Sequence, residues 1–255
     1  MIKNLRYPFT EKGDIDSPVQ AEHHRSLIRN KPFLHKIYQK WYSQIVSSLP
    51  PVPGNVLELG SGGGFLSNYV PQAIRSDVLH LQSLDLVCAA QKLPFKGNSL
   101  KAVIMINVLH HIPSVEDFFR EASRCLKSKG RIIVVEPWMS CMGRLVYKYL
   151  HHEACLPEAH NWSFSAQGPL SGANAALPWI VFDRDQDLFA QLFPQLHLCQ
   201  VTTEANFRYL LSGGLSYRSI LPGWAYPGVE FIENILPEQI QALVSLFACI
   251  QIEKM

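Results

Sequence analysis

The segment from Val56 to Phe65, VLELGSGGGF, constrains the fold of this chain more than any other. Its first half, VLEL, is typical of a strand buried inside a parallel sheet. Glycine then occupies every second position, at Gly60, Gly62 and Gly64, so the backbone can turn with positive φ and a ligand can approach its N–H groups closely. A strand, a glycine-rich turn and a helix in this order predict a doubly wound α/β sheet that binds a nucleotide at the carboxyl ends of its strands.

The glycine spacing excludes two common nucleotide sites. A dinucleotide fingerprint needs glycine at its first, third and sixth positions. Counted from Gly60 the sixth position is Phe65, and counted from Gly62 it is Ser67, so a nicotinamide oxidoreductase is disfavoured. A phosphate-binding loop needs the sequence Gly-Lys-Ser/Thr, and no lysine lies between Gly60 and Val70.

An acid followed by glycine at alternate positions, starting at Glu58, resembles the first motif of class I S-adenosylmethionine-dependent methyltransferases. Further motifs follow in order: LPF at 93–95, VLHHIP at 108–113 and GRIIVVEP at 130–137. Together they are similar to the type-11 methyltransferase domain, a group that includes many small-molecule methyltransferases. The resemblance covers roughly residues 50–137, about a third of the chain. It implies S-adenosylmethionine as cofactor and S-adenosylhomocysteine as product.

The same resemblance assigns a set of cofactor-binding residues. Glu58 would receive the ammonium group or a ribose hydroxyl, and Asn107 would line the methionine side. An acid at the end of the second strand would bind the ribose, and Asp77 suits this position better than Asp85 because the next strand then starts near Leu84. The full set is Glu58, Gly60, Ser61, Gly62, Gly64, Asp77, Ala89, Ala90 and Asn107.

One position departs from the family pattern. Relatives commonly carry Asp-Ala after the third strand, where this chain has Ala89-Ala90. Loss of one hydrogen bond to the adenine would weaken binding by about 1 kcal/mol. An alternative therefore stays open, in which the chain is a non-catalytic partner or regulatory domain with a degenerate cofactor site.

His110 and His111 are the candidate catalytic residues, because they follow the fourth strand directly. Histidine is the usual general base near neutral pH. One ring is expected to point toward the cofactor and the other into the fold. Methyl transfer can also proceed by positioning alone. A structural or cofactor-side role is therefore equally consistent with the histidine pair.

The resemblance extends the fold to a Rossmann-like, seven-stranded sheet whose last strand is antiparallel and lies between the fifth and sixth. Strands are expected at 55–59, about 77–81, 84–88, 101–107, 131–136, 197–203 and 246–253, and helices at 31–46, 64–70, 114–127 and 142–150. The expected organisation is an amino-terminal segment with a lid helix (1–53), a cofactor-binding half (54–137), an inserted cap (138–196) and strands that complete the domain (197–255).

The inserted cap combines aromatic and polar residues, as substrate pockets do. Its candidate substrate residues are His151, His152, Trp162, Asn174 and Trp179, although an ordinary packing loop is the alternative. No metal is expected at His151-His152-Glu153, because consecutive histidines on a helix point in different directions.

Composition narrows the setting. A net charge of +2 indicates no nucleic-acid footprint, and the six cysteines include no CxxC pair. The polar start of the sequence and the shortness of its apolar runs predict neither a signal peptide nor a stable membrane insertion. We expect a cytoplasmic methyltransferase acting on an oxygen, nitrogen or carbon nucleophile of a small molecule.

Overall fold

A seven-stranded sheet runs through the computed structural model, which describes residues 17–151, 153–166, 168 and 172–255. The strand order is β3-β2-β1-β4-β5-β7-β6, and β7 is antiparallel to both of its neighbours. The strands are β1 (Asn55–Leu59), β2 (Ile74–Asp77), β3 (Leu86–Val87), β4 (Leu100–Ile106), β5 (Leu126–Pro137), β6 (Leu196–Ala205) and β7 (Ser245–Lys254). The predicted fold class is confirmed, including the place and direction of the last strand.

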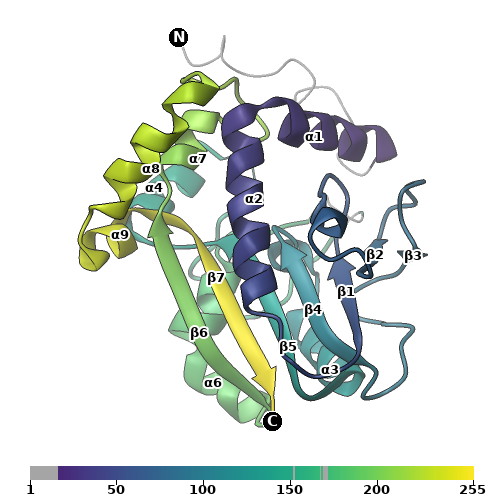
Figure 1. The fold of residues 1–255 in the computed structure, drawn as a ribbon. Helices are drawn as coiled ribbons and strands as arrows, with labels where there is room; N and C mark the ends of the chain where they lie inside the picture. Colours follow the sequence, from purple (N-terminus) through teal and green to yellow (C-terminus); the bar gives the residue numbers. More distant parts are fainter. Residues whose placement is uncertain (1–16, 152, 167, 169–171) are drawn as a thin grey trace.

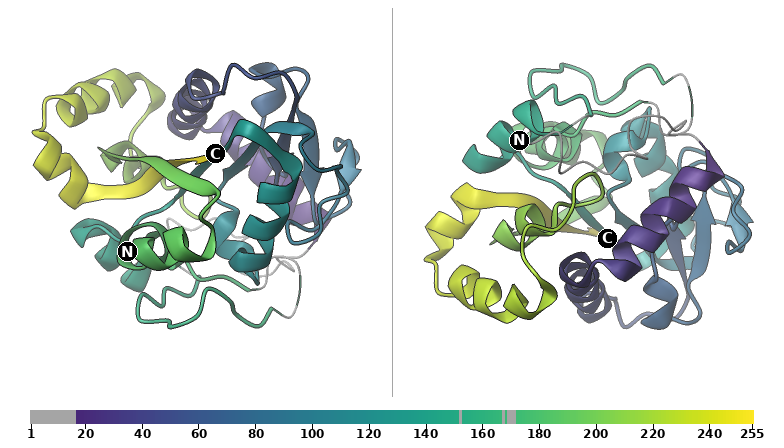
Figure 2. Two further views of the ribbon diagram at one scale, coloured as in Figure 1. Left: turned by 90° about the horizontal axis from the view of Figure 1, so that it is seen from below. Right: turned by 90° about the horizontal axis from the view of Figure 1, so that it is seen from above.

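Helices cover both faces of the sheet, and the carboxyl ends of the parallel strands point toward α1 (Figure 1). Figure 2 shows the same layers from the two ends of the strands. The helices are α1 (Pro18–Asn30), α2 (Pro32–Ser47), α3 (Val115–Cys125), α4 (Cys141–Tyr149), α5 (Leu177–Trp179), α6 (Gln186–Leu192), α7 (Phe207–Ser212), α8 (Tyr226–Asn234) and α9 (Glu238–Val244). Single turns add η3 (Leu66–Asn68), η4 (Leu109–His111), η5 (Ile180–Arg184) and η6 (Gly223–Ala225).

Each face of the sheet has its own apolar core. On the face of α3, Phe119 is fully buried and its ring centroid lies 5.1 Å from that of Phe189. On the other face, α2 buries a stripe that includes Phe33, Leu34 and Trp41. Both helices occur where the apolar periodicity predicts them. α3 also has the expected cap, because the Ser114 hydroxyl accepts a hydrogen bond from the backbone of the helix's first turn.

Strand β2 lies earlier in the chain than the sequence predicts. It ends at Asp77, whereas we expected a strand at about 77–81. The Asp77 carboxylate accepts a hydrogen bond from the Leu79 N–H at 3.0 Å, and this local turn takes the apolar run that follows out of the sheet. The helix expected at 64–70 is also wrong, because only the single turn η3 forms there. The link between β1 and β2 therefore contains little helix.

Helix α1 is absent from the sequence prediction because its residues are mostly polar. Ser17 caps it by accepting from the Gln20 N–H, and Pro18 occupies its first turn. The helix buries only a few side chains, among them Leu27 and Ile28. It therefore depends on packing against the rest of the protein more than on an amphipathic pattern.

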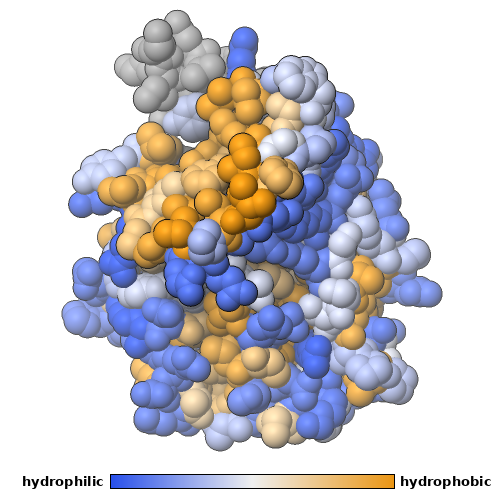
Figure 3. Space-filling view, turned by 60° about the vertical axis from the view of Figure 1, so that its left-hand side comes forward, coloured by the Kyte–Doolittle hydropathy of each residue, from blue (hydrophilic) through white to orange (hydrophobic). Residues whose placement is uncertain are grey.

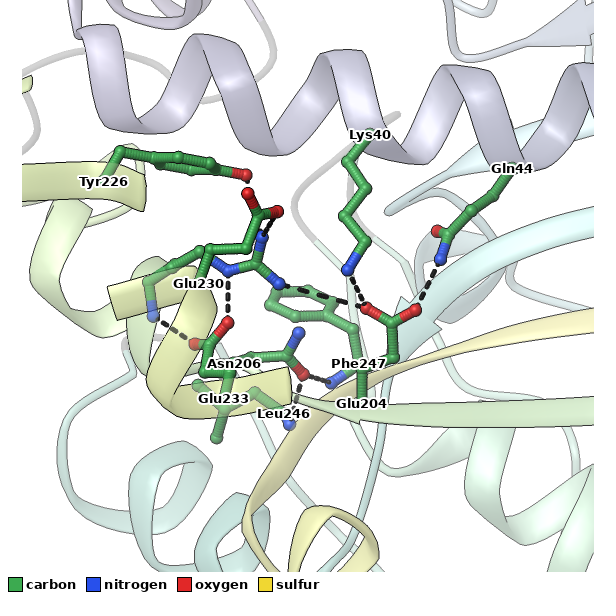
Figure 4. A network of polar contacts seen from close by, with 10 residues as sticks. Lys40, Gln44, Glu204, Asn206, Tyr226, Glu230, Glu233, Leu246 and Phe247 are labelled. Atoms are coloured by element: carbon green, nitrogen blue, oxygen red, sulfur yellow. Dashed lines mark hydrogen bonds and ion pairs between the residues drawn. The ribbon is translucent and has the colours of Figure 1, made fainter. Parts of the chain in front are cut away.

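A partly buried polar network joins α2, β6, α7 and α8 (Figure 4). Arg208 of α7 forms ion pairs with Glu233, which is almost fully buried, and with Glu230 at 2.5 Å. Glu204 of β6 accepts from Lys40 at 2.5 Å and from Gln44 at 2.7 Å. Ion pairs and hydrogen bonds therefore hold this side of the molecule together along with apolar packing.

Large apolar side chains gather on the outside of the same region (Figure 3). Trp224 of η6 is 83 % exposed, and α4, α8 and α9 add Leu145, Tyr149, Phe231, Ile232 and Leu243. Ile235, directly after α8, is also exposed. Among the described helices, none has both the length and the apolar character needed to cross a membrane.

Candidate active site

The glycine loop is tied to the carboxyl ends of β1 and β2. The Ser61 hydroxyl donates to Glu58 Oε2 at 2.9 Å, and the Ser61 N–H donates to the Ser76 carbonyl at 2.9 Å. The Gly62 N–H donates to Asp77 Oδ2 at 3.1 Å. The sequence therefore places this loop correctly between the first two strands, although little helix follows it.

Two of the glycines are required by the surroundings of the loop. Gly60 has φ +68°, and a Cβ there would lie 2.2 Å from Cγ2 of Val108. A Cβ on Gly64 would lie 2.6 Å from the hydroxyl oxygen of Tyr42. At Gly62, the one atom of the described residues that a Cβ would approach within 4 Å is the Asp77 carboxylate oxygen, at 3.3 Å. The loop therefore lies directly against an acid at this position.

Glu58 is a buried acid directly before this loop, with 6 % of its surface exposed. Burial raises the pKa of its carboxyl from 4.5 to about 7. The Ser61 hydrogen bond and the charge of Arg75 oppose the rise in this pKa, whereas the nearby charge of Asp77 adds to it. A cation bound here would favour the ionised carboxylate.

The structure separates the two candidates for the ribose-binding acid. Asp77 ends β2 beside the glycine loop, and burial raises its pKa. Asp85 instead forms an exposed, bidentate pair with Arg75, with distances of 2.8 and 3.0 Å. This pairing lowers the pKa of Asp85 to about 2. Geometry therefore favours Asp77, and its contact with a cofactor stays a prediction.

Ala89 and Ala90 follow β3 at the same edge of the sheet. The Cys88 N–H donates to the Asp77 carbonyl at 3.0 Å, so the residues after it start beside Asp77. Ala89 is exposed and carries no side-chain acceptor. Ala89 and Ala90 thus follow the third strand, as the sequence predicts. Neither side chain replaces the acid that relatives carry here.

Asn107 directly follows β4 with φ +57°, and its side chain interacts with the Tyr38 hydroxyl. Burial raises the pKa of Tyr38 to about 12, so this phenol stays protonated. Tyr42, one turn further along α2, accepts from the Phe65 N–H at 2.9 Å. Helix α2 thus supplies two phenols to the edge of the site.

The predicted lid, helix 31–46, contacts the site through these phenols, but α1 lies across the loop itself. A Cβ on Gly63 would lie 3.0 Å from the Arg25 nitrogen and 3.2 Å from Cδ1 of Ile28, both in α1. The remaining pocket is small, and its lining includes Arg25, Glu58 and Arg75. Helix α1 therefore narrows the space beside the glycine loop.

His110 and His111 lie in η4, and both of their Nε2 atoms face Glu153. His110 Nε2 is 3.2 Å from Glu153 Oε2, and His111 Nε2 is 3.6 Å from Oε1. Nδ1 of His110 lies 2.6 Å from Glu136 Oε2, and Nδ1 of His111 lies 3.1 Å from the Gly172 carbonyl. These Nδ1 contacts turn both rings toward the Glu153 carboxylate. The expectation that one ring points toward the cofactor and the other into the fold stays a prediction.

The two imidazoles differ in protonation. Burial alone would lower the pKa of His110, but the charges of Glu136 and Glu153 outweigh it and raise this pKa to about 10. Burial and the neighbouring His110 charge lower the pKa of His111. His110 is therefore a charged hydrogen-bond donor near neutral pH and does not suit the role of general base.

Two of the predicted substrate residues have structural partners. The Trp162 ring N–H donates to Asp185 Oδ2 at 2.9 Å, and the ring is almost fully buried. Asn174 is also buried, and its side-chain oxygen accepts from Leu156 at 2.9 Å and from Ala176 at 3.1 Å. These contacts fasten the inserted segment onto the core, and a substrate role for either residue stays a prediction.

The other predicted substrate residues lie nearer the surface. Trp179 is half-buried, and the Arg144 guanidinium lies 4.7 Å from its ring centroid. His151 Nδ1 lies 3.7 Å from Glu153 Oε2, so this histidine borders the His110 cluster. His152 lies outside the described residues.

This sheet order, with a glycine turn after β1 and an antiparallel β7, defines the fold of class I methyltransferases. The family model described as "Methyltransferase domain" matches residues 57–134, from β1 to β5. The resemblance to the type-11 methyltransferase domain is thereby confirmed, and this domain implies S-adenosylmethionine as the cofactor.

Solved structures agree on the fold. Geranyl diphosphate methyltransferase in complex with S-adenosylmethionine has a TM-score of 0.52 at 13 % identity, covering 91 % of this chain and 90 % of the other. A possible histamine N-methyltransferase from Thermotoga maritima has a TM-score of 0.52 at 15 % identity, covering 92 % of this chain and 99 % of the other. No curated protein matches the chain significantly.

Proposed function

We propose that this protein is an S-adenosylmethionine-dependent methyltransferase acting on an oxygen, nitrogen or carbon nucleophile of a small molecule. The observation that supports it most is the meeting of two buried acids, Glu58 and Asp77, at a glycine loop that donates hydrogen bonds to both. Asn107 adds a polar side chain at the end of the adjacent strand. Parallel strands bring these groups to one edge of the sheet, where doubly wound folds bind nucleotides.

The chemistry of these groups fits the cofactor. S-Adenosylmethionine supplies an electrophilic methyl group on a positively charged sulfur, next to an amino acid and a ribose. Glu58 accepts hydrogen bonds from a cationic or hydroxyl group, and its raised pKa shows how poorly its negative charge is compensated within the protein. Asp77 offers a second carboxylate with two acceptor oxygens, as a ribose diol needs.

Rate acceleration in this proposal comes mainly from positioning. A nucleophile held in line with the methyl group, in a site closed to water, gains the entropic advantage of an intramolecular reaction. The charged His110 is unsuited to proton abstraction. His111 acts as a base only if its Nε2 turns away from Glu153, since that atom lies 3.6 Å from the carboxylate. We therefore assign both histidines to orienting the acceptor side.

The choice of a small molecule as acceptor rests on the domain group, in which such substrates are common. A non-catalytic role is the alternative, and the exposed Ala89 favours it because the adenine would lose an acceptor. The intact glycine loop and the two acids favour the enzyme. A cytoplasmic location stays a prediction.

Binding and transfer experiments separate these possibilities. Isothermal calorimetry with S-adenosylhomocysteine, S-adenosylmethionine and NAD should show binding of the first two only. Asp77→Asn should weaken that binding, and the exposed Asp85→Asn serves as its matched control. Incubation with methyl-labelled cofactor and a small-molecule extract should then yield labelled products. Cofactor binding without transfer to any fraction would favour the regulatory role, and absence of binding would refute both the enzyme and its cofactor site.

A further inference from the structure

We propose that His110, His111 and Glu153 form a binding site for a divalent cation of the zinc class. The cluster combines two imidazoles and a carboxylate, the ligand types that zinc prefers in open catalytic sites. One ligand atom from each residue lies within 4.8 Å of the other two. The site follows from side-chain geometry alone and does not require that the chain be a methyltransferase.

Each imidazole lies close to one of the two Glu153 carboxylate oxygens. The His110 Nε2–Glu153 Oε2 separation is 3.2 Å, and the His111 Nε2–Glu153 Oε1 separation is 3.6 Å. Zinc bonds of about 2.0–2.1 Å in a tetrahedron place neighbouring ligand atoms about 3.4 Å apart. The two rings are 4.2 Å apart between centroids, so one ion can reach both with small side-chain rotations.

The outer contacts of both rings are those of metal-binding histidines. A metal-bound imidazole usually donates its other ring N–H to a carboxylate or a backbone carbonyl. His110 Nδ1 meets Glu136 Oε2 at 2.6 Å, and His111 Nδ1 meets the Gly172 carbonyl at 3.1 Å. Such contacts favour the proton on Nδ1 and direct each Nε2 toward Glu153, so a bound ion would take the place of the Nε2 proton of the charged His110.

Glu136 is itself held in place from the other side. Its Oε1 accepts hydrogen bonds from the Val108 and Leu109 N–H groups, each at 2.7 Å. The side chain is fully buried, so a nearby cation offsets the cost of its negative charge. A proton on His110 places one positive charge beside Glu136. A divalent ion in place of that proton would place two positive charges there.

The cluster is buried at His110 and slightly exposed at His111 and Glu153. The exposed side-chain fraction is 3 % for His110, 14 % for His111 and 15 % for Glu153. Three protein ligands leave a fourth position open, as in catalytic rather than structural zinc sites. The ion can therefore accept a ligand from outside the protein.

The position of the cluster suggests which ligand. Val108, two residues before His110, occupies the space that a Cβ on Gly60 would need, so the cluster lies close to the glycine loop. On the proposed function, the open position would bind an anionic oxygen of the acceptor, such as a carboxylate, phosphate or phenolate. This assignment of substrate class rests on the proposed function, whereas the metal site itself does not.

The first test measures metal binding directly. Untagged protein is stripped with a chelator and titrated with Zn²⁺ by calorimetry, and S-adenosylhomocysteine affinity is recorded on the stripped protein. We expect one equivalent of Zn²⁺ to bind, at least tenfold more weakly in His111→Ala and in Glu153→Gln. His197→Ala removes an exposed histidine of β6 and should leave Zn²⁺ affinity unchanged. Absence of stoichiometric binding, or equal affinity in all variants, refutes the site.

A second measurement uses only the unmodified chain, in case a variant fails to fold. X-ray absorption at the zinc edge should show two imidazole ligands and oxygen ligands completing a four-coordinate site. A shell containing sulfur, or fewer than two imidazoles, refutes the assignment.

Intact S-adenosylhomocysteine binding in the stripped protein would show that the proposed function stands even if the metal site fails. Zn²⁺-dependent labelling of anionic acceptors alone supports the substrate class, and labelling independent of Zn²⁺ refutes it.

Discussion

Replacement of Glu58 by glutamine should make the protein more stable at alkaline pH and impair cofactor binding. The Glu58 carboxyl has a pKa of about 7 in the folded protein, mainly because it is buried, and 4.5 without this environment. Between these two values the folded state binds more protons than the unfolded state. The free energy of unfolding of the wild type therefore falls as pH rises through this window.

The magnitude follows from the size of the shift. A difference of one pKa unit corresponds to about 1.36 kcal/mol, so the rise from 4.5 to about 7 costs about 3 kcal/mol of stability above pH 7. Glutamine has a similar shape and can still accept the Ser61 hydrogen bond of 2.9 Å, but it does not ionise. Glu58→Gln should therefore gain about 3 kcal/mol relative to the wild type at pH 8, with little of this gain left at pH 4.5.

Urea denaturation at a series of pH values from 4.5 to 8 measures the effect. Asp85→Asn is the matched control, because Asp85 is exposed at the same edge and its pKa is lowered to about 2, outside this window. The stability difference between Glu58→Gln and the wild type should grow with pH, while that of the control stays flat. A difference independent of pH would refute the reasoning that Glu58 is a destabilising buried acid.

The same variant links stability to binding. A charge-assisted hydrogen bond contributes about 1.5–3 kcal/mol. Glu58→Gln should therefore bind S-adenosylhomocysteine roughly tenfold to a hundredfold more weakly in calorimetry at pH 8. Unchanged affinity would remove Glu58 from the cofactor site. Loss of affinity together with gained stability would show that Glu58 favours ligand binding but lowers the free energy of unfolding.

Three further predictions concern the remaining residues of the site and its support. Asp77→Asn should weaken S-adenosylhomocysteine binding at least about tenfold by calorimetry, because a charge-assisted contact is lost. Asp85→Asn should leave this affinity nearly unchanged, and the reverse order would move the ribose site to Asp85. Arg208→Met should lower the free energy of unfolding by about 3–5 kcal/mol because it leaves the buried Glu233 unpaired. In urea denaturation, the double variant with Glu233→Gln should recover part of this loss, and equal stability of the single and double variants would contradict a buried ion pair. Gly60→Ala should lower the melting temperature in scanning calorimetry, since its φ of +68° and the crowded Cβ position disfavour any side chain; an unchanged melting temperature would mean that the loop is not confined.

Local sequence patterns predicted several strands and helices of this fold correctly. The apolar run before Gly60 forms β1, and the periodic stripe after Ser114 forms α3 with the expected cap. The strand and the capped helix depend on residues near one another in the chain, so periodicity, capping and turn chemistry reveal them. The antiparallel last strand between the fifth and sixth was instead what the resemblance to class I methyltransferases implied.

Tertiary packing decided the rest. Helix α1 crosses the glycine loop although its own pattern is mostly polar, and Asp77 ends β2 early because its carboxylate bonds to a backbone N–H two residues ahead. The raised pKa of Glu58 comes from burial by neighbouring elements. Glu153 reaches His110 and His111 only because the segment after α4 folds back over η4. Distances between distant segments and the burial of a charge are set by how layers pack together, and no short stretch of sequence encodes them.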